Sequence, residues 1–173
     1  MSMKHIFVFD QDKCSACSAC MMGCMDQNDI DLAAGDQCFR KTYDNELKLN
    51  DGSNYCAYIS AACMHCTDAP CITACPVGCL SKDPETGFTI YDNTNCIGCK
   101  SCAMACPFGA PRYRVADGKM VKCDGCNDRV KNGMKPACVR ACSFGALQCM
   151  TEEEFKAQEN LRALHTIAKN LCP

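Results

Sequence analysis

Large apolar side chains are scarce in this sequence. Leu, Ile, Val and Phe together supply 28 of its 173 residues. That share, about 16%, is a level at which a highly charged chain would be expected to be disordered. The formal net charge is only -2, so disorder is not indicated, but the apolar core must be thin. We therefore expect another kind of cross-link to hold the protein together, and folding to depend on it.

Motifs of common catalytic and nucleotide-binding sites are also absent. The sequence has no G-x-G-x-x-G, P-loop, nucleophile elbow or H-E-x-x-H motif. No segment approaches a membrane-spanning helix, which needs roughly 18 or more consecutive apolar residues. The first residues contain no apolar stretch of signal-peptide length. We expect a non-catalytic chain without a membrane span, located in the cytoplasm unless a signal-bearing partner exports it to the periplasm.

Positive charge is concentrated in residues 96–140, which contain nine Lys or Arg and three Asp. This segment has only Phe108 and Tyr113 as aromatic side chains and no recognition motif, so nucleic acid is not an expected partner. Two interpretations stay open. The segment forms either a solvated face that offsets negative charge or a docking face for an acidic partner.

Cysteine, by contrast, is present in excess, with 21 residues. Sixteen of them fall into four quartets with short internal spacings: Cys14, Cys17, Cys20 and Cys24; Cys63, Cys66, Cys71 and Cys75; Cys96, Cys99, Cys102 and Cys106; Cys123, Cys126, Cys138 and Cys142. The first and third quartets have the C-x2-C-x2-C-x3-C spacing of bacterial 4Fe-4S proteins. Cys75 and Cys106 are each followed by proline, as in that motif. The spacing predicts thiolate-bound iron-sulfur clusters.

Disulfides and structural zinc are the competing interpretations. The odd number of cysteines leaves one thiol unpaired, and no signal peptide indicates an oxidising compartment. Zinc would suit the fourth quartet taken alone. In the first and third quartets, however, four cysteines fall within 11 residues, which is a tighter spacing than that of the paired cysteines in zinc ribbons. Four thiolates per cluster leave no iron open to a substrate, so transfer of single electrons is the chemistry that these residues support.

An internal repeat links three of the quartets. Residues 71–79 (CITACPVGC), 102–110 (CAMACPFGA) and 138–146 (CVRACSFGA) share their cysteine and glycine positions. The shared glycine is expected to take a positive φ, or to allow close backbone approach, after a helical turn. Cys79 stands where the other copies have alanine, so we expect a packing residue and not a ligand. We expect ordinary thiols at the remaining cysteines, which belong to no quartet: Cys38, Cys56, Cys149 and Cys172.

One histidine lies inside a quartet. His65 stands between Cys63 and Cys66, and we expect it beside a cluster or on the surface. Tuning of the cluster potential is the alternative.

Short strands are expected next to the quartets. His5–Asp10 and Gly87–Tyr91 are rich in β-branched and aromatic residues, which predicts strands, and Tyr55–Ile59 and Arg112–Val115 are weaker candidates. Residues 35–55 predict a loop or hairpin between the first two quartets.

The C-terminal segment, residues 151–173, has the pattern of an amphipathic helix. Thr151 and Glu154 form a capping box at its start. Four apolar side chains follow as one stripe: Leu161, Leu164, Ala168 and Leu171. We expect this helix to pack on its own domain, with docking to a partner subunit as the alternative.

Three segments together resemble a known family: residues 63–76 (CMHCTDAPCITACP), 96–113 (CIGCKSCAMACPFGAPRY) and 122–147 (KCDGCNDRVKNGMKPACVRACSFGAL). They are similar to the four-cluster iron-sulfur (beta) subunit of dimethyl sulfoxide reductase and its relatives among the molybdopterin oxidoreductases. The resemblance implies an α+β fold of two bacterial-ferredoxin-like modules, each holding two 4Fe-4S clusters. One module would comprise residues 1–34 with 117–150, and the other residues 35–116.

The resemblance also implies which cysteines share a cluster, because the last cysteine of each run crosses to the other cluster of its module. The implied sets are Cys14, Cys17, Cys20 and Cys142 for cluster 1; Cys24, Cys123, Cys126 and Cys138 for cluster 2; Cys63, Cys66, Cys71 and Cys106 for cluster 3; Cys75, Cys96, Cys99 and Cys102 for cluster 4. Some relatives lack the cysteine that corresponds to Cys102 and hold a three-iron cluster. Its presence here favours four 4Fe-4S centres.

The function that the resemblance implies is a relay of electrons to or from a catalytic subunit that contains molybdopterin or tungstopterin. Cluster 1 would lie nearest that subunit, and cluster 4 nearest a membrane-anchor or other redox subunit. A free-standing polyferredoxin, or a carrier linked to hydrogenase or formate dehydrogenase, is the alternative. Cys24 and Cys142 lack the proline that usually follows, and Cys79 replaces the usual alanine, but no ligand is lost.

Overall fold

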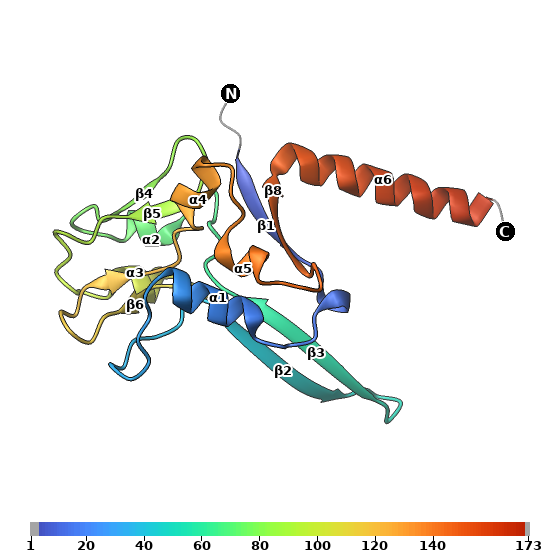
Figure 1. Cartoon of the computed structure of the whole chain (residues 1–173), viewed down its shortest axis with the longest axis horizontal. Coiled ribbons are helices and arrows are strands. Elements are labelled where there is room, and N and C mark those ends of the chain that lie inside the picture. Colours follow the sequence, from blue (N-terminus) through green and yellow to red (C-terminus); the bar gives the residue numbers. More distant parts are fainter. Residues whose placement is uncertain (1–3, 172–173) are drawn as a thin grey trace.

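Short strands, short helices and the loops between them form the body of the molecule (Figure 1). A computed structural model describes residues 4–171, with side chains described as far as residue 161. The strands in this part form four two-stranded antiparallel sheets. Their bounds are β1 His5–Phe9, β2 Lys41–Lys48, β3 Asn54–Ala61, β4 Leu80–Lys82, β5 Thr89–Tyr91, β6 Arg112–Tyr113, β7 Met120–Val121 and β8 Leu147–Thr151. The helices are η1 Gln11–Lys13, a 3-10 turn, and the α-helices α1 Ala19–Gln27, α2 Pro70–Thr73, α3 Ser101–Ala105, α4 Asn127–Lys131, α5 Ala137–Arg140 and α6 Glu152–Leu171.

Segments from the two ends of the chain form one group of elements. Strand β1 runs antiparallel to β8, with Phe9 opposite Leu147, and helix α1 packs against α5. Gly23 allows this close approach, because a Cβ there would lie 3.0 Å from the Cβ of Ala141. The first and fourth quartets therefore lie side by side. The strand predicted at His5–Asp10 is confirmed, whereas β8 has no counterpart among the predicted strands.

The middle of the chain forms the second group. Strand β4 pairs with β5, β6 pairs with β7, and α2 contacts α3. Because α2 carries Cys71 and α3 carries Cys102, this contact joins the second and third quartets. The strands predicted at Gly87–Tyr91 and Arg112–Val115 are present in shorter form as β5 and β6.

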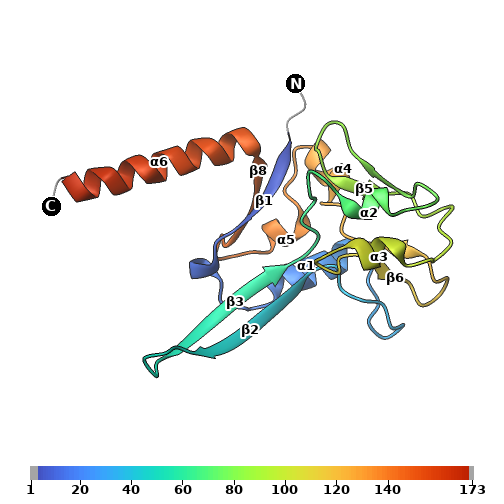
Figure 2. The ribbon, with the colours of Figure 1, turned by 180° about the vertical axis from the view of Figure 1, so that it is seen from behind.

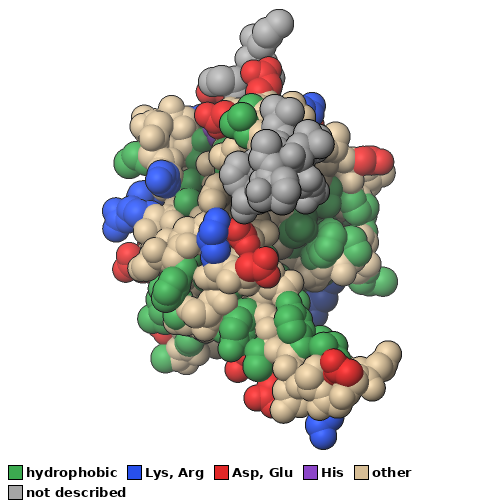
Figure 3. Space-filling view, turned by 90° about the vertical axis from the view of Figure 1, so that its right-hand side faces the viewer, with side chains coloured by type: hydrophobic (Ala, Val, Ile, Leu, Met, Phe, Trp, Pro, Cys, Tyr) green, Lys and Arg blue, Asp and Glu red, His purple; other side chains and the backbone are tan. Residues whose placement is uncertain are grey.

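A long hairpin projects from the body of the molecule (Figures 1 and 2). Strands β2 and β3 pair over their whole length, and Asp51 closes the turn by accepting hydrogen bonds from the backbone and hydroxyl of Ser53. Several large apolar side chains on the hairpin are exposed, including Tyr43 at 47% and Leu47 at 49%. Figure 3 shows hydrophobic side chains spread over this face. The hairpin predicted within residues 35–55 is confirmed, although β3 continues to Ala61.

Helix α6 begins as predicted but does not pack as predicted. The backbone N–H of Thr151 donates to Glu154 at 2.8 Å, and the Thr151 hydroxyl accepts from the Glu154 N–H at 3.2 Å, which confirms the capping box. The helix then extends away from the body (Figure 2). Leu161, the first member of the expected apolar stripe, is 67% exposed. This exposure contradicts packing on the chain's own domain at Leu161, the member of the stripe whose side chain the structure describes. Leu164, Ala168 and Leu171 lie beyond the described side chains.

Cysteine side chains take up much of the core. One buried cluster combines Phe39 and Leu147 with three cysteines: Cys24, Cys123 and Cys138. The other combines Leu80 and Met120 with a small alanine and two cysteines: Ala69, Cys71 and Cys102. Apolar contact alone is thin in both clusters, as the composition indicates. Bonds from these sulfurs to a shared metal group would supply the missing cross-links.

We expect the iron-free chain to lose cooperative folding, because the cysteines that fill the core would then have no common partner. Circular dichroism during heating of the loaded, iron-stripped and reconstituted chain measures this directly. The loaded and reconstituted samples should melt in one cooperative transition and the stripped sample should show none. A stripped chain that kept the native spectrum and melted cooperatively would contradict the expectation.

Candidate iron-sulfur sites

The twenty cysteines among the described residues are all free thiols. Within the same residues, no group of three or more His, Cys, Asp or Glu side chains is placed to hold a single metal ion. Sulfurs of three predicted ligand sets instead surround cavities. A cavity ringed by soft thiol donors suits a metal cluster several atoms wide.

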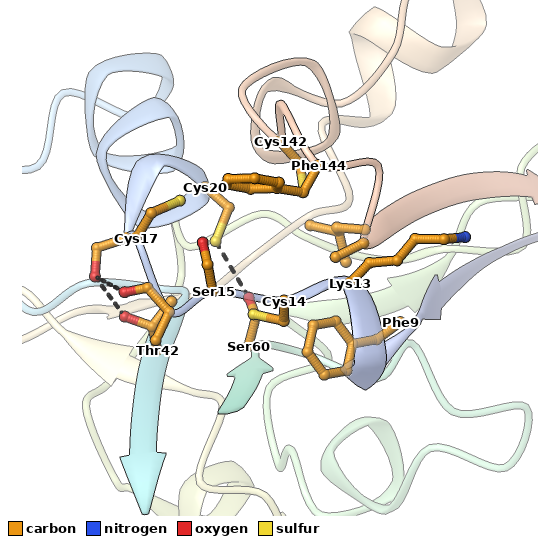
Figure 4. A pocket seen from close by; sticks show the side chains of 14 residues that line it. Phe9, Lys13, Cys14, Ser15, Cys17, Cys20, Thr42, Ser60, Cys142 and Phe144 are labelled. Carbon is orange, nitrogen blue, oxygen red and sulfur yellow. Dashed lines mark hydrogen bonds between the residues drawn. The ribbon is translucent and has the colours of Figure 1, made fainter. Parts of the chain in front are cut away.

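The first cavity lies in front of helix α1 (Figure 4). Its walls include all four cysteines predicted for cluster 1: Cys14, Cys17, Cys20 and Cys142. Ala16 and Ser18 take left-handed φ values of 53° and 62°, which turn the loop tightly at this point. The hydroxyl of Ser60, on β3, lies 3.3 Å from the sulfur of Cys20. The rings of Phe9 and Phe144 line the same cavity and make its wall largely apolar.

The second cavity holds the four cysteines predicted for cluster 3: Cys63, Cys66, Cys71 and Cys106. Pro107 and Phe108 supply apolar walls, and the buried Lys122 completes them. The side chain of Lys122 is only 1% exposed and donates hydrogen bonds to the carbonyls of Thr89 and Cys123, at 2.5 and 2.6 Å. A fixed positive charge therefore stands at the wall of this cavity. It would favour the ionised thiolates that a cluster needs.

The third cavity holds the cysteines predicted for cluster 4: Cys75, Cys96, Cys99 and Cys102. The hydroxyl of Tyr113 lies 3.3 Å from the sulfur of Cys102. Burial and this neighbour raise the pKa of Tyr113 above its ordinary value. The backbone N–H of Met120 donates to the sulfur of Cys96 at 3.3 Å. Cys79 also lines the cavity.

The cysteines predicted for cluster 2 are the most buried of the four sets. Three of its four members, Cys24, Cys123 and Cys138, belong to one buried cluster, and Cys126 opens helix α4. Burial, followed by the nearby Cys138, raises the pKa of Cys24 to about 12. Burial likewise raises the pKa of Cys123 well above its ordinary value. Such thiols ionise at neutral pH only beside a strong positive charge, which bound iron would supply.

The internal repeat is visible in backbone geometry. Gly78, Gly109 and Gly145 have φ values of 65°, 56° and 64°, which confirms the positive φ expected at the shared position. The residue after the glycine donates its N–H to the preceding cysteine sulfur in two copies. Cys79 does so to Cys75 at 3.3 Å, and Ala110 to Cys106 at 3.4 Å. Cys79 and its counterparts Ala110 and Ala146 are all buried. The alignment of Cys79 with alanine therefore holds in three dimensions.

Charged and ring side chains inside the protein were not apparent from the sequence. Arg40 is 3% exposed, and its guanidinium donates to the hydroxyl of Ser60 at 3.0 Å. Burial lowers the pKa of Arg40, but nearby thiols, with Cys138 first, more than offset this and raise it above its ordinary value. Lys122 was counted among the basic residues of a solvated or docking face, and for this residue that interpretation is wrong because it is buried.

His65 is also buried, at 6% exposure. Burial and the positive charges of Lys122, Lys82 and Arg40 hold the pKa of His65 well below its ordinary value. A surface position, one of the two expected for this residue, was wrong.

The cysteines outside the quartets occupy varied environments. Cys38 is buried and Cys56 is exposed. Burial raises the pKa of Cys149, on β8, to about 12. Cys172 lies outside the described residues.

Cavities ringed by thiols, held by loops between short paired elements, define a ferredoxin-like iron-sulfur protein. Comparison with known proteins agrees with this class. The model of the 4Fe-4S dicluster domain family matches residues 54–152. None of the helices that the structure describes is long and apolar enough to cross a membrane.

Similar proteins identify the family more closely. The B subunit of anaerobic dimethyl sulfoxide reductase from Escherichia coli K12 is 37% identical over 172 residues, which cover 95% of this chain and 79% of that protein. The formate dehydrogenase iron-sulfur subunit of Haemophilus influenzae is 34% identical over 164 residues, covering 86% of this chain and 52% of that subunit. The hydrogenase-2 operon protein HybA of Escherichia coli O157:H7 is 33% identical over 180 residues, covering 90% and 54% respectively. This protein belongs to the family of electron-transferring iron-sulfur subunits related to the B subunit of dimethyl sulfoxide reductase.

Two glycines allow a matched test of packing at the buried set. Gly125 and Gly133 have φ values of 79° and 70°, so alanine is strained at either position. A Cβ at Gly125 would lie 2.5 Å from the buried ring of Phe88, whereas a Cβ at Gly133 meets nothing within 4 Å. We expect Gly125→Ala to cost about 1–3 kcal/mol more than Gly133→Ala. It should also lower the iron content, because Gly125 lies between Cys123 and Cys126.

Denaturant unfolding and iron analysis of the two loaded variants measure the difference. Equal losses of stability and iron in both variants would contradict the contact with Phe88.

Proposed function

We propose that the chain holds four 4Fe-4S clusters and relays single electrons between a molybdopterin-containing catalytic subunit and a second redox partner. The clusters would be arranged in pairs. Residues 1–34 with 117–150 would bind the first pair through the first and fourth quartets. Residues 35–116 would bind the second pair through the second and third quartets. Helix α6 would lie outside both modules.

The observation that carries this proposal is the way the quartets exchange cysteines. Cys142, from the fourth quartet, lines the cavity of the first. Cys106, from the third quartet, lines the cavity of the second, and Cys75 lines the cavity of the third. Cys24, from the first quartet, lies with Cys123 and Cys138. These neighbours support sets in which three cysteines of one quartet would combine with the last cysteine of another, as in two-cluster ferredoxins.

Differences in burial support a relay with two accessible ends. Cys17 in the first cavity and Cys99 in the third are exposed, whereas Cys24, Cys123 and Cys138, three members of the set predicted for cluster 2, are buried. When bound, the clusters supply the one-electron chemistry. The chain would fix their order and shield the cluster held through Cys24, Cys123 and Cys138 from water. One buried set, together with sets that have exposed members, fits a relay that passes electrons through a protein.

Exposed apolar side chains next to the outer cavities are suited to partner contacts. Ile97 and Met104, which both lie between cysteines of the third quartet, are 66% and 86% exposed. Phe144, which lines the first cavity, is 57% exposed. Exposed large apolar side chains of this kind favour protein interfaces. The similarity to the B subunit of dimethyl sulfoxide reductase supports a molybdopterin-containing subunit as the partner at the first cavity, with cluster 4 facing the second redox partner.

A hydrogenase-linked electron carrier is the second candidate, favoured by the similarity to the hydrogenase-2 operon protein HybA. Both functions use the same relay. They differ in whether a molybdopterin-containing subunit binds next to the first cavity.

Cys102→Ser should damage cluster 4 and leave the other three clusters intact, because serine is a poor ligand for iron-sulfur cores. Cys79→Ala is the matched control, since Cys79 lines the same cavity and alanine occupies its place in the other two copies of the repeat. Electron paramagnetic resonance of the reduced proteins should show one altered or lost signal in the first variant and none in the second.

Binding to the catalytic subunit should survive in both variants, because the proposed contact lies at the first cavity. Four unaltered clusters in Cys102→Ser, or a damaged cluster in Cys79→Ala, would refute the ligand assignment. Loss of catalytic-subunit binding in Cys102→Ser with a folded chain would refute the proposed orientation.

A further inference from the structure

His65 connects the second quartet to the fourth. It lies in the loop between Cys63 and Cys66, yet its Nε2 atom is 3.7 Å from the sulfur of Cys123, 58 residues further along the chain. The two quartets concerned would belong to different modules. The ring thus extends from a loop of one cluster pair to a sulfur of the other pair.

The proton on this ring is assigned by a hydrogen bond on its other side. The backbone N–H of Thr89 donates to Nδ1 of His65 at 3.1 Å. Nδ1 must therefore be the unprotonated nitrogen of the neutral ring, so Nε2 carries the hydrogen. The contact with Cys123 is then an N–H donor directed at a sulfur. Its length is within the range of hydrogen bonds to sulfur, which are longer than those to oxygen.

The orientation of the ring is held from several directions. Phe7 stacks on it at 5.8 Å between ring centroids, and the fully buried Phe88 packs at 4.7 Å. The ammonium of Lys82 donates to the His65 carbonyl at 3.1 Å. The backbone has a left-handed φ of 47°, which is rare for a residue other than glycine. Left-handed backbone of this kind persists where the surroundings over-determine it, and such residues cluster at functional sites.

We infer that His65 is a positioning residue that donates a hydrogen bond to the Cys123 sulfur and thereby raises the reduction potential of the cluster bound through Cys123. Hydrogen bonds to ligand sulfurs withdraw electron density from the thiolate, which stabilises the reduced form of a cluster. The inference rests on the proposed function for the assignment of Cys123 as a ligand. It adds a link through which one cluster pair influences the potential of the other.

His65→Phe keeps a ring of similar shape between Phe7 and Phe88 and removes the N–H donor. A redox titration of the loaded chain, followed by electron paramagnetic resonance, should show one midpoint displaced to a lower potential and the other three unchanged. His65→Gln keeps an N–H donor on a side chain of comparable length and should restore the midpoint most of the way to the wild-type value. A purely structural role would lower cluster content without this selective shift.

His5→Phe is the matched control. Its ring also packs on Phe88, at 6.0 Å, and its Nδ1 atom has no hydrogen-bond partner among the residues that the structure describes. The same substitution in the same aromatic group should therefore move none of the midpoints. The inference is overturned if His65→Phe moves no midpoint, if it moves all of them equally, or if His65→Gln and His5→Phe reproduce its effect.

A measurement on the wild-type chain covers the case in which His65→Phe fails to load iron. The sequence contains three histidines, so the chain can be labelled with nitrogen-15 in histidine alone. Pulsed electron paramagnetic resonance of the reduced clusters should detect a coupling to this nitrogen-15, and His65→Gln should abolish it. Clusters without any such coupling would overturn the inference and leave the proposed function standing. A chain without clusters would instead remove the proposed function.

Discussion

Cysteine burial is the constraint on which this structure depends. Seven of the buried hydrophobic side chains in the described part of the chain are cysteines, whereas only Leu80 and Leu147 among them are leucines. Burial raises the pKa of three of these thiols, Cys24, Cys123 and Cys138, because it disfavours the thiolate. Iron coordination would compensate both for the scarce apolar contacts and for the unfavourable ionisation of the buried thiols. It would stabilise the thiolate and join segments that are distant in sequence, so we expect metal binding to contribute to folding in this protein.

The protein also places compensating charge inside. Arg40 and Lys122 are almost fully buried, and each lies next to cysteines of a proposed cluster. Their hydrogen bonds to backbone and hydroxyl groups hold the charges in place. Negative clusters with thiolate ligands need such compensation when water is excluded. Together with N–H donors to sulfur, these cations would give the proposed clusters different electrostatic environments, from which differences in potential between neighbouring clusters would follow.

Sequence patterns predicted the features that depend on local spacing. The cysteine quartets, the positive-φ glycines, the hairpin and the capping box of α6 all follow from residues close together in the chain. Strands β4 and β7 were not predicted, because a segment of two or three residues is too short to show an alternation of apolar and polar side chains. Strand β8 was missed because its partner β1 is at the other end of the chain.

Buried charge was not predictable in the same way. Arg40 and Lys122 are of residue types that usually lie at the surface, and only the three-dimensional placement of distant sulfurs makes their burial favourable. The neighbours of His65 were not predictable for the same reason, because Phe7, Phe88 and Cys123 come from three separate segments. The exposure of Leu161 on α6 was not predicted, because an apolar stripe does not specify which surface will cover it.

The most direct measurement of the central claim is the content of iron, acid-labile sulfide and zinc in the anaerobically purified chain. Four 4Fe-4S clusters correspond to about 16 iron and about 16 sulfide per chain, with zinc absent. A chain that contained zinc without sulfide, or that folded with about half the iron or less, would contradict the account of sixteen cysteines as ligands of four clusters.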